Sequence, residues 1–277
     1  MPAFLREEVR FHYLDLGNRE GIPFVFQHGL GGDVSQPISL FHPPPGIRML
    51  TFDFRAHGQT FPLEASAWKL ESLTFDTFAD DLVALLDLLG LQRAIVGGIS
   101  MGAGVALNVA VRYPDRVAAL VLSRPAWLAE PMPEGNVAIY AQIAHLLQQY
   151  GARSGLQRFQ ASEMYSSIAR SSPDAASSLL RQFENERTLE GVQRLLQIPR
   201  ARPIPKLNAA ASITVPCLVL ATQQDPIHPY EYATILAHSI PNAVFKELTP
   251  KSVCSKEQHA AEVQHTLDGF LAHVLHI

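Results

Sequence analysis

The chain has 277 residues, with 22 Lys and Arg, 26 Asp and Glu, and a formal net charge of -4. Its hydrophobic fraction of 47% and charged fraction of 17% exclude a disordered chain and predict a sizeable core in one large or two small domains. The slightly acidic balance, without a basic run, argues against nucleic acid and against an anionic membrane surface as partners. We therefore expect a small-molecule substrate, while composition does not define an oligomeric state.

The two cysteines cannot form a disulfide framework, since neither Cys217 nor Cys254 has a CxxC partner. We expect free thiols in a reducing compartment and a cytoplasmic protein. The N-terminal residues show no basic segment followed by an apolar one, so no signal peptide is expected. The uncharged run 94–111 is about as long as a membrane span, but its four glycines favour a buried strand, a turn and a buried helix.

Strand and helix patterns alternate along the first 124 residues. Strands are expected at 9–16, 24–26, 47–54, 94–96 and 117–122, and helices at 73–89 and 100–112. The helix at 73–89 has the clearest pattern, with one apolar face, Thr74 as its N-cap and Gly90 at its end. After residue 212 the alternation returns, with strands at 216–221 and 243–248 and helices at 230–238 and 257–274. This order predicts a mostly parallel sheet with helices on both faces.

The span 125–211 does not continue this alternation of strands and helices. It reads as several short helices and ends in the proline-rich segment 198–205. We expect a helical cap inserted between two core strands, so that residues 1–124 and 212–277 form the core. The aromatic residues of the span either line a substrate pocket or pack the cap against itself. They are Trp127, Tyr140, Phe159, Tyr165 and Phe183.

The strongest motif is Gly98-Ile-Ser-Met-Gly102, which directly follows a predicted strand and opens a predicted helix. A serine on such a sharp turn presents its hydroxyl at the carboxyl edge of the sheet, and small residues on either side let the turn close. The pattern predicts Ser100 as a nucleophile. The helix N-terminus then offers the backbone N–H of Met101 to a developing oxyanion.

A glycine-rich loop, His28-Gly-Leu-Gly-Gly32, follows an earlier predicted strand. It can bring the backbone N–H of Leu30 toward the same oxyanion, and His28 is expected to organise the loop rather than act as a base. The next strand is followed by Asp53-Phe-Arg-Ala-His-Gly58. There we expect an Asp53–Arg55 network to fix the loop near the site.

Together with Asp225, in Ala221-Thr-Gln-Gln-Asp-Pro226, these motifs resemble the α/β-hydrolase fold superfamily from about residue 9 to residue 275. The resemblance implies an eight-stranded, mostly parallel sheet flanked by helices, with a cap inserted, and a catalytic triad in the order serine, acid, histidine. It assigns the nucleophile to Ser100, the oxyanion donors to Leu30 and Met101, and the acid to Asp225.

The histidine departs from that pattern. The family places it in the loop after the last strand, but that loop, residues 249–255, contains none. His259 follows a capping-box pattern near the start of the last helix and borders its inward side, so it is the preferred base. His228, three residues after Asp225 and on the same edge of the sheet, is the alternative, either as base or as a pocket residue. A third possibility is that no histidine serves as a base.

The motifs predict a serine hydrolase that cleaves an ester, thioester or lactone of a small-to-medium, largely apolar substrate through an acyl-enzyme. Two alternatives stay open: a ligand-binding or sensor protein with a degraded triad, and a hydrolase of carbon–carbon bonds. No metal and no organic cofactor are expected, because the chain has no HExxH, no clustered His and Cys ligands and no GxGxxG.

Overall fold

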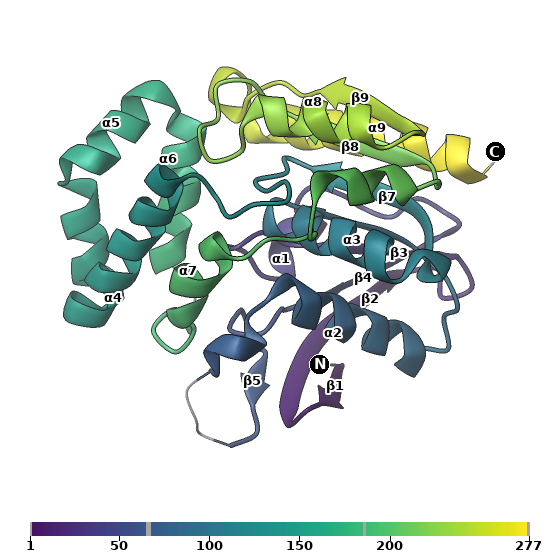
Figure 1. Cartoon of the computed structure of the whole chain (residues 1–277), viewed down its shortest axis with the longest axis horizontal. Coiled ribbons are helices and arrows are strands. Elements are labelled where there is room, and N and C mark those ends of the chain that lie inside the picture. The colour runs from purple at the N-terminus through teal and green to yellow at the C-terminus, as the bar shows by residue number, and fades with distance from the viewer. Residues whose placement is uncertain (1, 65–67, 185–186, 276–277) are drawn as a thin grey trace.

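The computed structural model describes residues 2–64, 68–184 and 187–275, and its centre is a twisted sheet with helices on both sides (Figure 1). The strands are β1 (Ala3–Arg6), β2 (Val9–Gly17), β3 (Ile22–Gln27), β4 (Ile47–Phe52), β5 (Phe61–Pro62), β6 (Ala94–Ile99), β7 (Val117–Ser123), β8 (Cys217–Ala221) and β9 (Ala243–Glu247). Their order is β1-β2-β4-β3-β6-β7-β8-β9, with β5 beside β2.

The sheet is mixed rather than uniformly parallel. From β4 through β9 along this order all neighbours are parallel, whereas β2 is antiparallel to β1, β4 and β5. The α/β class and the eight-strand path match the expectation from sequence, and the short β5 is an addition. Since parallel strands end at the same edge, the loops after β3, β6, β7 and β8 meet at one side of the sheet.

Helices cover both faces of this sheet because its strands bury alternate residues on opposite sides. Phe24 and Phe26 of β3 pack on the face covered by α9 (Lys256–Leu275), while Val25 packs on the face covered by α2 (Phe75–Leu88) and α3 (Met101–Arg112). α8 (Tyr230–Ser239) shares the α2–α3 side. The N-cap of α2 is as expected, since Thr74 accepts a hydrogen bond from the N–H of Thr77.

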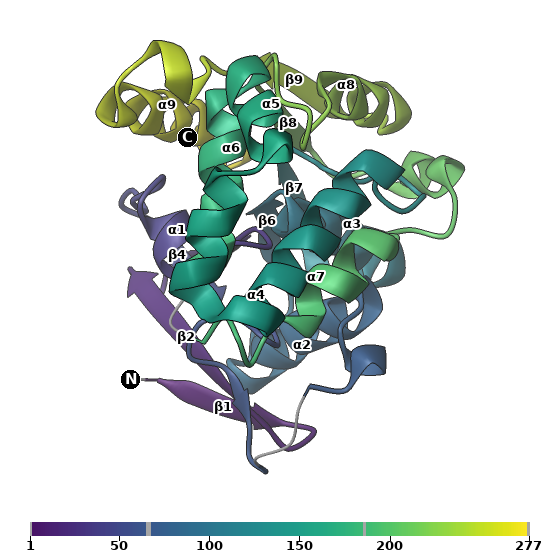
Figure 2. The same ribbon diagram turned by 90° about the vertical axis from the view of Figure 1, so that its left-hand side faces the viewer.

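The segment between β7 and β8 is helical. It contains α4 (Glu134–Gln160), α5 (Glu163–Ser171), α6 (Pro173–Leu180) and α7 (Gln193–Gln197), with short 3-10 turns directly after α6 and after α7. Figure 2 shows α4, α6 and α7 in front of β6 and β7. This helical insert, residues 125–211, therefore stands over the part of the sheet from which Ser100 emerges.

The expected Asp53–Arg55 network is wrong. Arg55 instead donates to both carboxylate oxygens of Asp81 on α2, at 2.8 Å each, and Asp81 is fully buried. Asp53 accepts hydrogen bonds from the backbone N–H groups of Val34 and Gln59, both at 2.8 Å. The two residues still hold the loops beside the site, but through separate partners, because Arg55 reaches a helix that sequence spacing alone does not place.

We expect Asp81→Ala to lower the free energy of unfolding by about 3–5 kcal/mol, because it leaves the guanidinium of Arg55 buried without its main partner. Urea denaturation measures this. The matched control on the same helix is Asp87→Ala, whose side chain is 63% exposed beside Arg116; it should change stability by less than about 1 kcal/mol. Equal effects of the two variants would contradict a structural role for the buried pair.

Candidate active site

Ser100 occupies a strained turn between β6 and α3. Its backbone has φ 57° and ψ −108°, and its N–H donates to the carbonyl of Ser123 at 2.9 Å. A Cβ at Gly98 would lie 2.4 Å from the carbonyl carbon of Gly102, and one at Gly102 would lie 2.6 Å from the carbonyl oxygen of Gln27. The turn therefore closes only with glycine at both positions, and it holds the serine at the carboxyl edge of the sheet.

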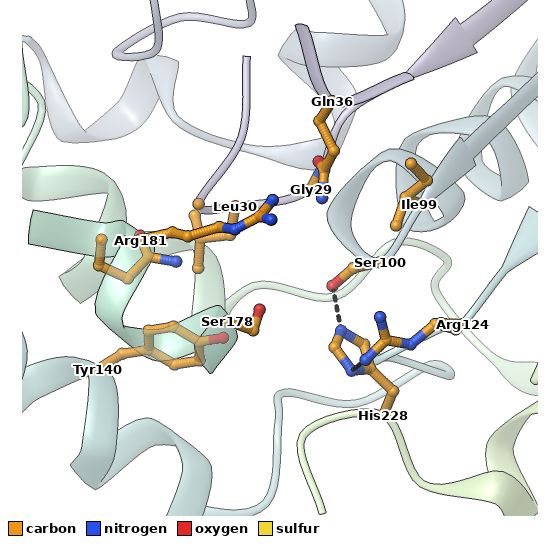
Figure 3. A pocket seen from close by; sticks show the side chains of 12 residues that line it. Gly29, Leu30, Gln36, Ile99, Ser100, Arg124, Tyr140, Ser178, Arg181 and His228 are labelled. Atoms are coloured by element: carbon orange, nitrogen blue, oxygen red, sulfur yellow. Dashed lines mark hydrogen bonds between the residues drawn. The ribbon is translucent and has the colours of Figure 1, made fainter. Parts of the chain in front are cut away.

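The structure brings Ser100, His228 and Asp225 together (Figure 3). Nε2 of His228 lies 2.9 Å from Oγ of Ser100, and Nδ1 lies 2.8 Å from Oδ2 of Asp225. All three residues are buried. The other carboxylate oxygen, Oδ1, accepts the backbone N–H groups of Ile227 at 3.1 Å and His228 at 3.2 Å, so the loop between β8 and α8 fixes both side chains. This is the relay geometry of a serine nucleophile, a base and an orienting acid.

Arg124, directly after β7, joins this group. Its guanidinium donates to Oδ2 of Asp225 and lies 3.2 Å from Nδ1 of His228. Burial alone would raise the pKa of Asp225, but His228 and Arg124 outweigh it and hold the pKa of this carboxyl well below its usual range. Burial lowers the pKa of His228, and Arg124 lowers it further against the opposing effect of Asp225. The imidazole is thus neutral near neutral pH, the state in which it can accept a proton.

His259, the preferred base in the sequence analysis, does not join Ser100 or Asp225. Its Nδ1 donates to the carbonyl of Thr249 at 2.9 Å. The capping box at the start of α9 forms as expected, because Ser255 and Gln258 exchange hydrogen bonds of 2.9 and 3.1 Å. The helix therefore starts where the capping box predicts. His259, however, points to the loop after β9, and the alternative, His228, lies beside Ser100.

The loop after β3 packs against the serine turn. His28 donates to the carbonyl of Gly29 at 2.8 Å and accepts the N–H of Phe54 at 3.1 Å, so it organises the loop as expected. The carbonyl of Leu30 accepts a hydrogen bond of 3.0 Å from Nε2 of His57. Within the described residues, neither the N–H of Leu30 nor that of Met101 has a hydrogen-bond acceptor.

A narrow pocket with a cavity volume of about 30 Å³ lies over Ser100. Its lining is Gly29, Leu30, Gly31, Gln36, Ile99, Ser100, Arg124, Tyr140, Ser178, Arg181, Gln182 and His228. Most of these side chains are polar, whereas the sequence analysis expects a largely apolar substrate. Of the insert's five aromatic residues singled out from the sequence, only Tyr140 reaches the pocket. Phe159 packs on Tyr165 and Phe183 inside the insert. Packing within the insert, not ligand contact, therefore accounts for these three residues.

Among residues 2–64, 68–184 and 187–275, no group of three or more His, Cys, Asp or Glu side chains is arranged to hold a metal ion. No helix in the described parts of the chain combines the length and apolar character that crossing a membrane requires. Cys217 and Cys254 are both free thiols, the first buried and the second half-buried.

A serine on a strand-to-helix elbow, at the carboxyl edge of a largely parallel sheet, defines the class of α/β hydrolases. The chain belongs to this family, because the family model described as alpha/beta hydrolase fold matches residues 22–252.

Relatives support the same assignment. The chain is 23% identical to 3-oxoadipate enol-lactonase 2 of Acinetobacter baylyi, over 94% of this chain and 95% of the relative. It is 37% identical to the dihydrolipoyllysine-residue acetyltransferase component of the acetoin cleaving system of Pseudomonas putida, over 47% of this chain and only 34% of that protein. The crystal structure of the enol-lactonase from Burkholderia xenovorans LB400 superposes with a TM-score of 0.72, covering 98% of this chain and all of that one at 23% identity.

We expect Gly98→Ala to destabilise the protein by about 1–3 kcal/mol, because the added methyl would overlap the backbone of Gly102. Thermal or urea unfolding measures the loss. The control is Gly135→Ala in the first turn of α4, where a Cβ would meet no atom within 4 Å; this change should be neutral or stabilise by about 0.5–1 kcal/mol. Unchanged stability of Gly98→Ala would refute the tight-turn explanation.

Proposed function

We propose that this protein is a serine hydrolase that cleaves a small ester or lactone through an acyl-enzyme formed on Ser100. The observation that carries the proposal is the hydrogen-bonded chain from Ser100 through His228 to Asp225, with 2.9 and 2.8 Å between the partner atoms. These distances lie within the reach that proton transfer requires. In this proposal His228 replaces His259 as the base.

The proposed reaction has two halves. Oγ of Ser100 attacks the carbonyl carbon while Nε2 of His228 takes its proton, and the resulting tetrahedral intermediate expels the alcohol, which leaves with that proton. Water then attacks the acyl-enzyme, His228 takes a proton from the water, and the released acid departs as the proton returns to Oγ. Asp225 orients the imidazole and stabilises its cation in both halves.

The proposed oxyanion hole consists of the backbone N–H groups of Leu30 and Met101. Two observations support it: both groups lack an acceptor within the described residues, and Met101 is the first residue of α3, where the helix dipole favours negative charge. We also propose that residues 125–211 act as a cap and that residues 1–124 and 212–277 form the core. Tyr140, Ser178 and Arg181 of this insert line the pocket over Ser100.

Two further observations favour an ester or lactone hydrolase over the other functions considered. A binding protein with a degraded triad was considered because no loop histidine follows the last strand, but His228 beside Ser100 removes that reason. Cleavage of a carbon–carbon bond would use the same side chains. We prefer a lactone or ester bond because one relative that matches nearly the whole chain is named as an enol-lactonase.

We expect Ser100→Ala and His228→Ala each to lower kcat/KM for an activated aryl ester by about 10³-fold or more, and the double variant to lose little beyond that, because triad members act as a unit. Loss of labelling by a fluorophosphonate in Ser100→Ala checks the nucleophile directly. The matched control is His259→Ala, which removes one buried hydrogen bond. It should cost about 1–3 kcal/mol of stability but change kcat/KM by less than about threefold. A large catalytic loss in His259→Ala with a mild one in His228→Ala would reverse the assignment.

The rate should rise with pH as His228 loses its proton, because only the neutral imidazole accepts the proton of Ser100. Burial and Arg124 lower the pKa of His228, so the midpoint of this rise should lie below the ordinary histidine value of 6.5. Arg124→Gln removes a positive charge that disfavours the imidazolium, so the midpoint should move to higher pH. Profiles of kcat/KM between about pH 4 and 8 measure it. A midpoint that stays or falls in Arg124→Gln would contradict this electrostatic coupling.

A further inference from the structure

The pocket over Ser100 contains two arginine side chains from different parts of the fold. Arg124 enters from the end of β7, and Arg181 enters from the helical insert with its side chain extended into the pocket toward Leu30 (Figure 3). The side chain of Arg124 is 12% exposed, and its Nε is buried without a hydrogen-bond partner. One terminal nitrogen of this guanidinium donates to Asp225. Arg124 therefore retains other N–H donors for a ligand.

Two more basic side chains, Lys251 and Arg194, lie outside the lining of the pocket. Burial and the charges of Arg124 and Arg181 lower the pKa of Lys251 to about 8. On the other side of the pocket, Arg194 is 1% exposed, and its Nε lies 3.4 Å from the carbonyl of Leu30. The hydrogen bonds of Arg194 go to backbone carbonyls and to a hydroxyl, not to a carboxylate, within the described residues.

Several carboxylates lie near these cations, but none of those described is paired with Arg181. Asp225 is shared between His228 and Arg124, and Asp174 lies near Lys251. The cavity that adjoins the pocket carries Asp33 and Glu184 beside Arg181, yet within the described ranges Arg181 forms no ion pair with a carboxylate. Arg181 therefore lines the pocket as a cation without a carboxylate partner among the described residues, in surroundings where charges interact more strongly than in water.

We propose that the substrate carries a carboxylate in addition to the scissile ester or lactone bond, and that the guanidinium of Arg181 binds this carboxylate, with Arg124 bordering the same space. A guanidinium offers two parallel N–H donors that match the two oxygens of a carboxylate. The inference rests on the proposed hydrolase function for its substrate class. It replaces the apolar substrate expected from sequence with an anionic one.

The test compares monomethyl glutarate with dimethyl glutarate, which share one carbon chain and differ in one negative charge; the succinate and adipate pairs extend the series. Release of acid in a pH-stat gives kcat/KM for the wild type, Arg181→Gln and Arg181→Lys. The control is Arg19→Gln, which removes the same charge from an 81% exposed side chain in the loop before β3, at the opposite edge of the sheet.

For the chain length that fits, the wild type should prefer the anionic ester by at least about tenfold, and Arg181→Gln should reduce this preference by about tenfold or more. Arg181→Lys should retain part of it, Arg19→Gln should retain all of it, and added salt should weaken it. An anionic-to-neutral ratio that is the same in the wild type and Arg181→Gln overturns the inference while leaving the proposed hydrolase function standing.

A binding experiment distinguishes failure of the carboxylate-binding proposal from failure of the proposed hydrolase function. In Ser100→Ala, which cannot form an acyl-enzyme, calorimetry compares glutarate with its uncharged diamide, with and without Arg181→Gln. Tighter binding of glutarate that is lost in Arg181→Gln supports an anion-binding pocket even if no ester is turned over. Equal binding of glutarate and the diamide, or binding of glutarate that Arg181→Gln leaves unchanged, overturns it.

Discussion

The contact between the β6–α3 turn and the end of β3 is the constraint on which the rest of the site depends. Because Gly102 packs against the carbonyl of Gln27, α3 begins immediately beside the loop that follows β3. In this close arrangement Ser100 has a positive φ of 57°, and a Cβ at Gly29, next to Leu30, would lie 3.3 Å from Cβ of Ser100. One steric requirement thus positions the proposed nucleophile and both proposed oxyanion donors, before any side chain of the insert is considered.

Much of this could be predicted from the sequence because the relevant signals are local. The glycines of the Ser100 turn, the cap of α2 at Thr74 and the apolar run of β7 each report a backbone requirement that the neighbouring residues satisfy. The partner of Arg55 was not predictable in this way. Asp81 lies on a helix whose apolar pattern gives its core face but not its position relative to a loop 26 residues earlier.

For a related reason, sequence spacing did not separate His228 from His259. His228 and His259 both lie in loops or helix starts at the carboxyl edge of the sheet, and one-dimensional spacing places both near the serine. The distinction depends on side-chain direction. A turn in which Oδ1 of Asp225 accepts two backbone N–H groups directs His228 toward Ser100, whereas His259 directs its Nδ1 to the carbonyl of Thr249. The proposed acid and base consequently share one short turn between β8 and α8.

Arg124 connects the proposed chemistry to the charge of the pocket. Oδ2 of Asp225 accepts from both Arg124 and His228, so its negative charge is divided and stabilises an imidazolium less than an unshared carboxylate would. The proposed base is therefore weaker, and a weaker base returns its proton more readily to a leaving group. A substrate carboxylate held beside Arg124 and Arg181 would offset part of this positive charge and strengthen His228 as a base. In this arrangement the charge that selects the substrate also tunes the group that activates the serine, and the two properties cannot be altered independently at Arg124.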